Sequence, residues 1–173
     1  MATTGADKAR DLFLVGLRNA HALETEAAQI IQRQLDRIVN YPEVADRLRL
    51  HLSETEHQKQ RIEEILGNLG ESHSSFKDMA AGFMGNMAAI AHAPAPDEIL
   101  KNSFANLAFE NYEIAAYTSL ICLGETASQG AALSLLQQSL KEEESMATWV
   151  KDNLRPLTLK FAERSAQGLD ADR

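Results

Sequence analysis

The chain has 173 residues, of which 45% are hydrophobic and 24% are charged, so wholesale disorder is excluded and one globular domain is expected. Its formal net charge of −8 argues against a nucleic-acid partner, because proteins that neutralise phosphates carry an excess of Lys and Arg. Few Gly, Pro and aromatic residues disfavour a β-sandwich or barrel.

The first half of the chain carries two stretches of helical periodicity. Apolar residues recur with a period near that of a helix over residues 7–39 and again over 42–67, which predicts two long helices. Pro42 separates them, because proline disfavours helical backbone at the preceding residue and is accepted in a first helical turn. Residues 72–97 are expected to form a long connection, with a short helix in the Met-, Ala- and Gly-rich part over 79–91.

The second half predicts two more long helices, over residues 97–125 and 128–154. Pro156 is expected to end the last one, leaving a short tail helix over 157–166 and frayed residues at 167–173. The single cysteine, Cys122, lies in an apolar stretch and is expected to be a core thiol in a reducing compartment.

Four long helices bury their apolar stripes best against one another, and two hairpins joined by one long connection form the ferritin-like topology. We therefore predict an all-α fold, a ferritin-like four-helix bundle with a long crossover between its second and third helices, as a single domain over residues 1–173. No stretch reaches the length of a membrane span or has the pattern of a secretory signal, so we expect a cytoplasmic protein without a membrane partner.

Acidic side chains interrupt the apolar stripes near the middle of the predicted helices. Three helices each place at least one carboxylate on or beside the apolar face: Glu24, Glu110, Glu113 and Glu143. The second helix supplies Glu54, and His57 follows three residues later, a spacing that puts both on one side of a helix.

Buried carboxylates require neutralisation, because an isolated ionised carboxylate is costly to bury and clustered like charges cost more. The stripes contain no matching set of inward Lys or Arg, so a pair of divalent metal ions is the most direct solution. Glu on two helices with Glu-x-x-His on two others is typical of di-iron and di-manganese bundles. The absence of Cys ligands argues against structural zinc, so the pattern favours two iron ions or, alternatively, manganese.

Each predicted long helix contains one short motif. Residues 51–58 match His-Leu-x-Glu-Thr-x-x-Gln, and residues 110–117 depart from Glu-His-Tyr-Glu-Ile-Ala-x-Tyr only at Asn111. Residues 140–143 match Leu-x-Glu-Glu, and residues 23–26 keep the Glu of Ala-Glu-x-Gln. Through these motifs the chain resembles the YciE/YciF family of ferritin-like stress proteins over residues 11–154. The second helix is also similar to bacterioferritin and rubrerythrin through its Glu-x-x-His, whereas Met146 stands where that wider superfamily has a ligand His.

The resemblance implies a dinuclear metal-binding protein of stress-response type and a homodimer. The ligands that it implies are Glu24, Glu54, His57, Glu110, Glu113 and Glu143. A reaction, if there is one, is expected to be oxidation of Fe(II) by a small-molecule oxidant, peroxide or oxygen. The alternative is a metal-free helical dimer that acts as an interaction or structural protein. The presence of Met146 in place of a ligand His favours this alternative.

Three assignments stay open at this point. Glu142 competes with Glu143 as the ligand of the fourth helix, since an error of one residue in helix phase exchanges them. His51, three residues before Glu54, is interpreted as a structural histidine, with a ligand or a donor to a ligand as alternatives. Tyr117 is interpreted as core packing, with a hydrogen bond to a ligand as the alternative.

Overall fold

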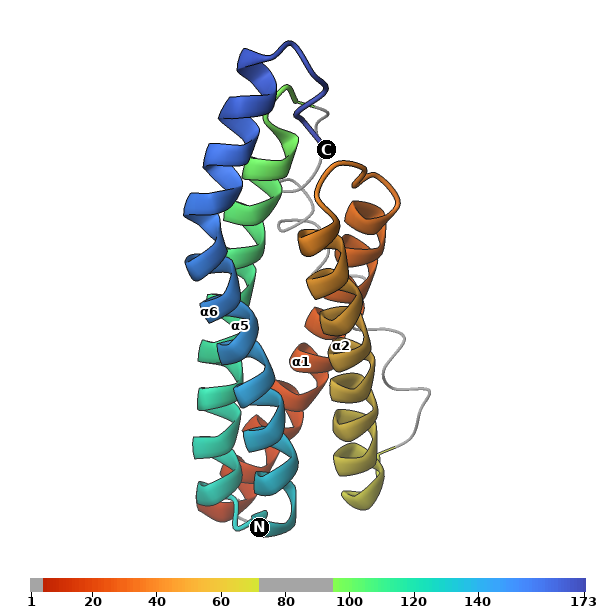
Figure 1. The fold of residues 1–173 in the computed structure, drawn as a ribbon. Coiled ribbons are helices and arrows are strands. Elements are labelled where there is room, and N and C mark those ends of the chain that lie inside the picture. Colours follow the sequence, from red (N-terminus) through yellow and green to blue (C-terminus); the bar gives the residue numbers. More distant parts are fainter. Residues whose placement is uncertain (1–4, 72–94) are drawn as a thin grey trace.

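The computed structural model describes residues 5–71 and 95–173 as an all-α bundle, drawn in Figure 1. Its helices are α1 (Gly5–Leu35), α2 (Pro42–Asn68), α5 (Glu98–Thr126) and α6 (Gly130–Ala166). Both described ranges contain helices and no strand, so the predicted all-α class is confirmed. The short helix expected over residues 79–91 lies outside the described residues.

The four helices of the described residues form two antiparallel hairpins, α1–α2 and α5–α6 (Figure 1). Helix α1 packs against α2 and α5, and α6 packs against α5 and α2. Helix α2 ends at the opposite end of the bundle from the start of α5 (Figure 1), which is the arrangement of the predicted ferritin-like topology. No helix in the described part of the chain is long and apolar enough to cross a membrane.

The last helix is longer than the sequence predicts, because α6 continues through Pro156 to Ala166. Proline has no backbone N–H, so the carbonyl of Asp152 one turn earlier loses its helical partner. Asp152 is exposed, and water can take that place. The expected break at Pro156 and the separate tail helix are therefore wrong.

The C-terminal segment is docked against the bundle, where the sequence predicts fraying. The Tyr41 hydroxyl donates to the carbonyl of Ala171 at 2.6 Å, and the Ile99 amide donates to that of Asp172 at 2.8 Å. Gly168, at φ 69°, supplies the left-handed turn that ends α6 and sends the chain back. The tail thereby joins the start of α2 to the start of α5.

The apolar core consists of two clusters, one toward each end of the bundle. One is built around Phe13, Leu17, Ile62 and Leu120, and the other around Tyr41 with residues such as Leu48, Ile99 and Met146. Between them lies a layer of buried polar side chains from all four helices: Glu24, His51, Thr55, Gln58, Glu110, Glu113, Ser139 and Glu143. Cys122 belongs to neither cluster and is exposed, so the expected core thiol is wrong.

Candidate metal centre

Four acidic and imidazole side chains converge in the middle of the bundle. His51 comes from α2, Glu110 and Glu113 from α5, and Glu143 from α6. Each offers one potential ligand atom, and these atoms lie within 4.8 Å of one another. All four side chains are buried. This group is called the His–Glu cluster below.

Helical spacing accounts for the convergence. On α5, Glu110, Glu113 and Tyr117 are separated by three and four residues, so they share one face of the helix. On α6, Glu143 lies on the same buried face as Ser139 and Met146. The two apolar clusters hold these faces together and keep solvent away from the layer between them.

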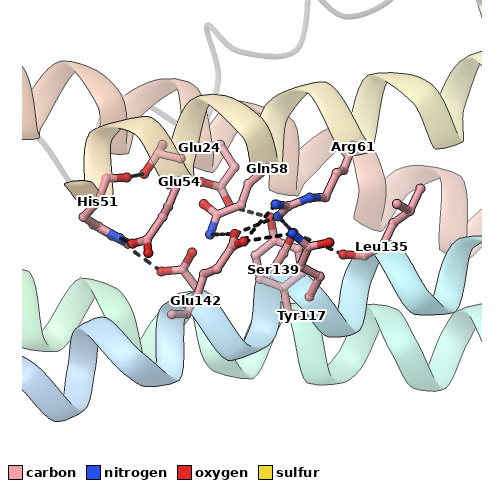
Figure 2. Close-up of polar contacts among 12 residues, drawn as sticks. Glu24, His51, Glu54, Gln58, Arg61, Tyr117, Leu135, Ser139 and Glu142 are labelled. Atoms are coloured by element: carbon pink, nitrogen blue, oxygen red, sulfur yellow. Dashed lines mark hydrogen bonds and ion pairs between the residues drawn. The ribbon is translucent and has the colours of Figure 1, made fainter. Parts of the chain in front are cut away.

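His51 has a carboxylate on each side of its ring, as Figure 2 shows in part. Its Nδ1 lies 3.1 Å from Oε2 of Glu54. Its Nε2 lies 3.2 Å from Oε2 of Glu110 and 3.7 Å from Oε2 of Glu143. Burial by itself lowers the pKa of the imidazole, but Glu110, Glu54 and Glu143 together raise it to about 10.

Glu113 and Glu143 are buried, and no hydrogen-bond donor within residues 5–71 and 95–173 compensates their burial. Their exposed fractions are 1% and 0%, and neither oxygen of either side chain accepts a hydrogen bond from a described residue. Burial, followed by the repulsion of neighbouring carboxylates, raises the pKa of both groups well above the usual range. Such a pair is either protonated or bound to a cation.

Glu24 adjoins the cluster from α1. The Tyr117 hydroxyl donates to its Oε1 at 2.5 Å, whereas its Oε2 is buried and accepts no hydrogen bond from a described residue (Figure 2). Burial raises the pKa of Glu24 to about 8, although the hydrogen bond from Tyr117 and the charge of His51 act in the opposite direction. Tyr117 therefore holds the carboxyl group of Glu24 at the edge of the cluster. Of the two interpretations of Tyr117, this is the hydrogen bond to a candidate ligand and not core packing alone.

Glu142 and Glu143 have different roles. Glu142 accepts two hydrogen bonds from Arg61, at 2.7 and 2.8 Å, and one from Gln58 at 3.1 Å (Figure 2). Its charge is therefore balanced by a guanidinium at the α2–α6 seam. Glu143, one residue later, points into the cluster, and His51 is its only cationic partner among the described residues.

The predicted ligands divide into three groups. Glu110, Glu113 and Glu143 come together with His51, and Glu24 lies beside them. Glu54 lies outside the converging group and is 21% exposed at its side chain. His57 is exposed and lines a surface pocket, so the structure does not bring it to the cluster.

Sequence reasoning interpreted His51 as structural, with a ligand as an alternative, and missed Arg47 altogether. His51 takes the position expected of His57, because the core face of α2 runs through Leu48, His51 and Thr55. Arg47 is an inward cation, buried to 8% exposure, where none was expected, and its Nη1 lies 3.0 Å from Oε2 of Glu54. Burial raises the pKa of Glu54, but hydrogen bonds and charge from His51 and Arg47 lower it below the usual value. The signal for both was present as polar residues at core spacing on α2.

Comparison with known proteins agrees with this architecture. A family model described as a domain of unknown function (DUF892) matches residues 8–163. A protein of Xanthomonas campestris pv. campestris has a similar structure, with 26% identity, a TM-score of 0.76, and coverage of 91% of this chain and 99% of its own. The Escherichia coli stress protein YciF is similar at 21% identity and a TM-score of 0.67, over 89% of this chain and 96% of its own.

YcfI of Rhodopseudomonas palustris is similar at 22% identity and a TM-score of 0.65, over 87% of this chain and 98% of its own. These likenesses extend over nearly the whole described bundle, and the family match includes all four helices apart from the first turn of α1 and the last turn of α6. The chain therefore belongs to the DUF892 family, which confirms the resemblance to the YciE/YciF proteins.

Proposed function

We propose that this protein binds divalent transition-metal ions in the His–Glu cluster, with iron as the preferred metal and manganese as the alternative. The observation that carries the proposal is the burial of Glu113 and Glu143 without a hydrogen-bond donor to any of their four oxygens among the described residues. Carboxylate and imidazole ligands without thiolates suit iron and manganese.

Charge supports a pair of ions. Glu24, Glu110, Glu113 and Glu143 carry four negative charges when ionised, which two divalent ions would balance. His51, Glu110, Glu113 and Glu143 would hold the metal, and Glu24 would supply the further carboxylate that a second ion needs. Tyr117 would keep Glu24 oriented, and the flanking apolar clusters would exclude water.

The proposed function also includes a redox reaction and a role under stress. Bound iron would supply one-electron redox chemistry, so oxidation of Fe(II) by peroxide or oxygen is the expected reaction. The name of the structurally similar E. coli protein, a stress protein, supports a role under stress. The homodimer stays a prediction that sedimentation equilibrium would check.

The test is the metal content after anaerobic loading with Fe(II) or Mn(II), compared between Glu143→Gln and Glu142→Gln. The two residues are neighbours in the chain, but only Glu143 belongs to the cluster. We expect about two ions per wild-type chain, the number in the di-iron bundles of this architecture. Glu143→Gln should lose most of them, and Glu142→Gln should keep them. Equal loss in both variants, or no uptake by the wild type, would contradict the proposal.

A metal-free structural or interaction protein is the second candidate. It is favoured by the internal ion pairs, since His51 lies near three carboxylates and Arg47 balances Glu54. This candidate expects the thermal stability to be indifferent to chelators and to added metal. Metal binding expects the opposite, because a ligand that binds only the folded state stabilises it.

A further inference from the structure

Three residues on one face of α2 form a row that leads into the cluster. Arg47, His51 and Glu54 are separated by four and three residues, so their side chains lie on the same side of the helix. Oε2 of Glu54 lies between the other two, 3.0 Å from Nη1 of Arg47 and 3.1 Å from Nδ1 of His51. The row runs from a buried guanidinium through a carboxylate to a buried imidazole.

The two nitrogens of His51 face different surroundings. Nδ1 points to Glu54, which has its own cation in Arg47. Nε2 points to Glu110 and Glu143, which belong to the converging group. A neutral imidazole that binds a metal through one nitrogen carries its proton on the other, and that proton is donated to a carboxylate, a carbonyl or water.

We infer from this geometry that His51 binds metal through Nε2 and donates its Nδ1 proton to Glu54. Glu54 is then a positioning residue, and Arg47 holds Glu54 in place. The inference rests on the proposed metal-binding function. It departs from the ligand set implied by sequence resemblance, in which Glu54 is itself a ligand.

The charge of Glu54 supports this role. In the described part of the chain, Glu113 and Glu143 have no guanidinium or ammonium partner, whereas Glu54 is paired with Arg47 and is partly exposed to solvent. Glu54 therefore does not need a metal ion to be compatible with its site. Moving its carboxylate into the cluster would break its contacts with Arg47 and His51, and would leave the buried guanidinium of Arg47 without its partner.

Zn(II) is the probe for the first measurement, because it is diamagnetic and leaves the histidine signals of the ¹⁵N-labelled full-length protein visible. Long-range ¹H–¹⁵N spectra show which ring nitrogen of His51 carries the proton and which binds the metal. We expect the proton on Nδ1 and the metal on Nε2. A proton on Nε2, or a His51 that does not bind Zn(II), would overturn the inference.

Substitutions of Glu54 provide the second measurement, Zn(II) affinity by competition with a coloured chelator. Glu54→Ala removes the acceptor of the Nδ1 proton and should weaken binding by about 10- to 100-fold, the usual effect of losing such a partner. Glu54→Gln keeps a carbonyl oxygen that can accept this proton, so its affinity should stay near the wild-type value. The matched control is Glu142→Ala, another half-buried Glu paired with an Arg, which should also stay near wild type.

The outcomes separate this inference from the proposed function. If the wild type binds Zn(II) and Glu54→Gln is as weak as Glu54→Ala, Glu54 is a ligand and the inference is wrong, while the metal site stands. If the wild type takes up neither Zn(II), Fe(II) nor Mn(II), the proposed function fails and the inference fails with it.

Discussion

Replacing Glu24 by Gln should stabilise the metal-free protein, and increasingly so as the pH rises. Burial gives Glu24 a pKa of about 8, against 4.5 for an ordinary Glu. At pH 7.5 this group is ionised in the unfolded chain, whereas it is mostly protonated in the folded chain. One pKa unit corresponds to about 1.4 kcal/mol. The difference between the folded-state and unfolded-state pKa of Glu24 therefore lowers the folding stability by about 4 kcal/mol at pH 7.5 and by about 1 kcal/mol at pH 5.

The direction in which stability changes with pH follows from the raised pKa of Glu24. A carboxyl whose pKa is higher in the folded state contributes stability below about pH 4.5, and that contribution is lost as the pH rises through about 8. Gln cannot ionise, so the Glu24→Gln variant is free of this loss. Burial of the amide adds a cost that does not depend on pH, and the test is therefore the change in the difference between the two proteins.

Urea denaturation of chelator-treated protein at pH 5 and pH 7.5 measures this difference. The variant should gain about 3 kcal/mol relative to the wild type between the two pH values, because that is the loss it avoids. With saturating metal the order should reverse, since a ligand carboxylate has been removed. A difference that stays constant with pH would refute the reasoning that the bundle holds Glu24 protonated when no metal is bound.

Further predictions concern the histidines, the metal and the tail. His51→Gln should abolish most metal uptake, whereas His57→Gln should leave the measured metal content unchanged, because only His51 belongs to the cluster. Metal at about 100 times its dissociation constant should raise the unfolding free energy by about 2.7 kcal/mol, seen as an increase in Tm that chelator reverses. Tyr41→Phe removes the 2.6 Å hydrogen bond to the tail and should cost about 0.5–1.5 kcal/mol, which corresponds to a fall of a few degrees in Tm by calorimetry. An unchanged Tm in this last variant would show that the tail contact contributes nothing to stability.

The helices could be predicted because each buries one stripe, and the spacing of apolar residues reports that stripe directly. The exception is the end of α6, where Pro156 does not end the helix. The carbonyl that loses its helical partner there belongs to Asp152, which is exposed. The docked tail could not be predicted, because its partner, Tyr41, lies 130 residues away in the sequence. Local periodicity carries no information about such a contact.

The site was predicted in part for a similar reason. Carboxylates that interrupt a clear apolar stripe, such as Glu24 and Glu113, were identified because their apolar neighbours indicate the helix phase. Glu143 was also identified, but Glu142 remained its rival until the structure placed only Glu143 in the cluster. On α2, His57 was predicted from its spacing to Glu54 and from the family resemblance, but it is exposed. The buried face of α2 instead includes His51, which sequence reasoning interpreted as structural because a polar residue does not mark an apolar stripe.

The most direct test of a metal site in this cluster is anomalous diffraction at the iron edge from crystals of the Fe(II)-loaded protein. The account predicts an anomalous peak bounded by Nε2 of His51 and the carboxylates of Glu110, Glu113 and Glu143. It also predicts that Oε2 of Glu54 stays on Nδ1 of His51. Iron at His57 or another surface position, with none in the cluster of a fully loaded crystal, would contradict it.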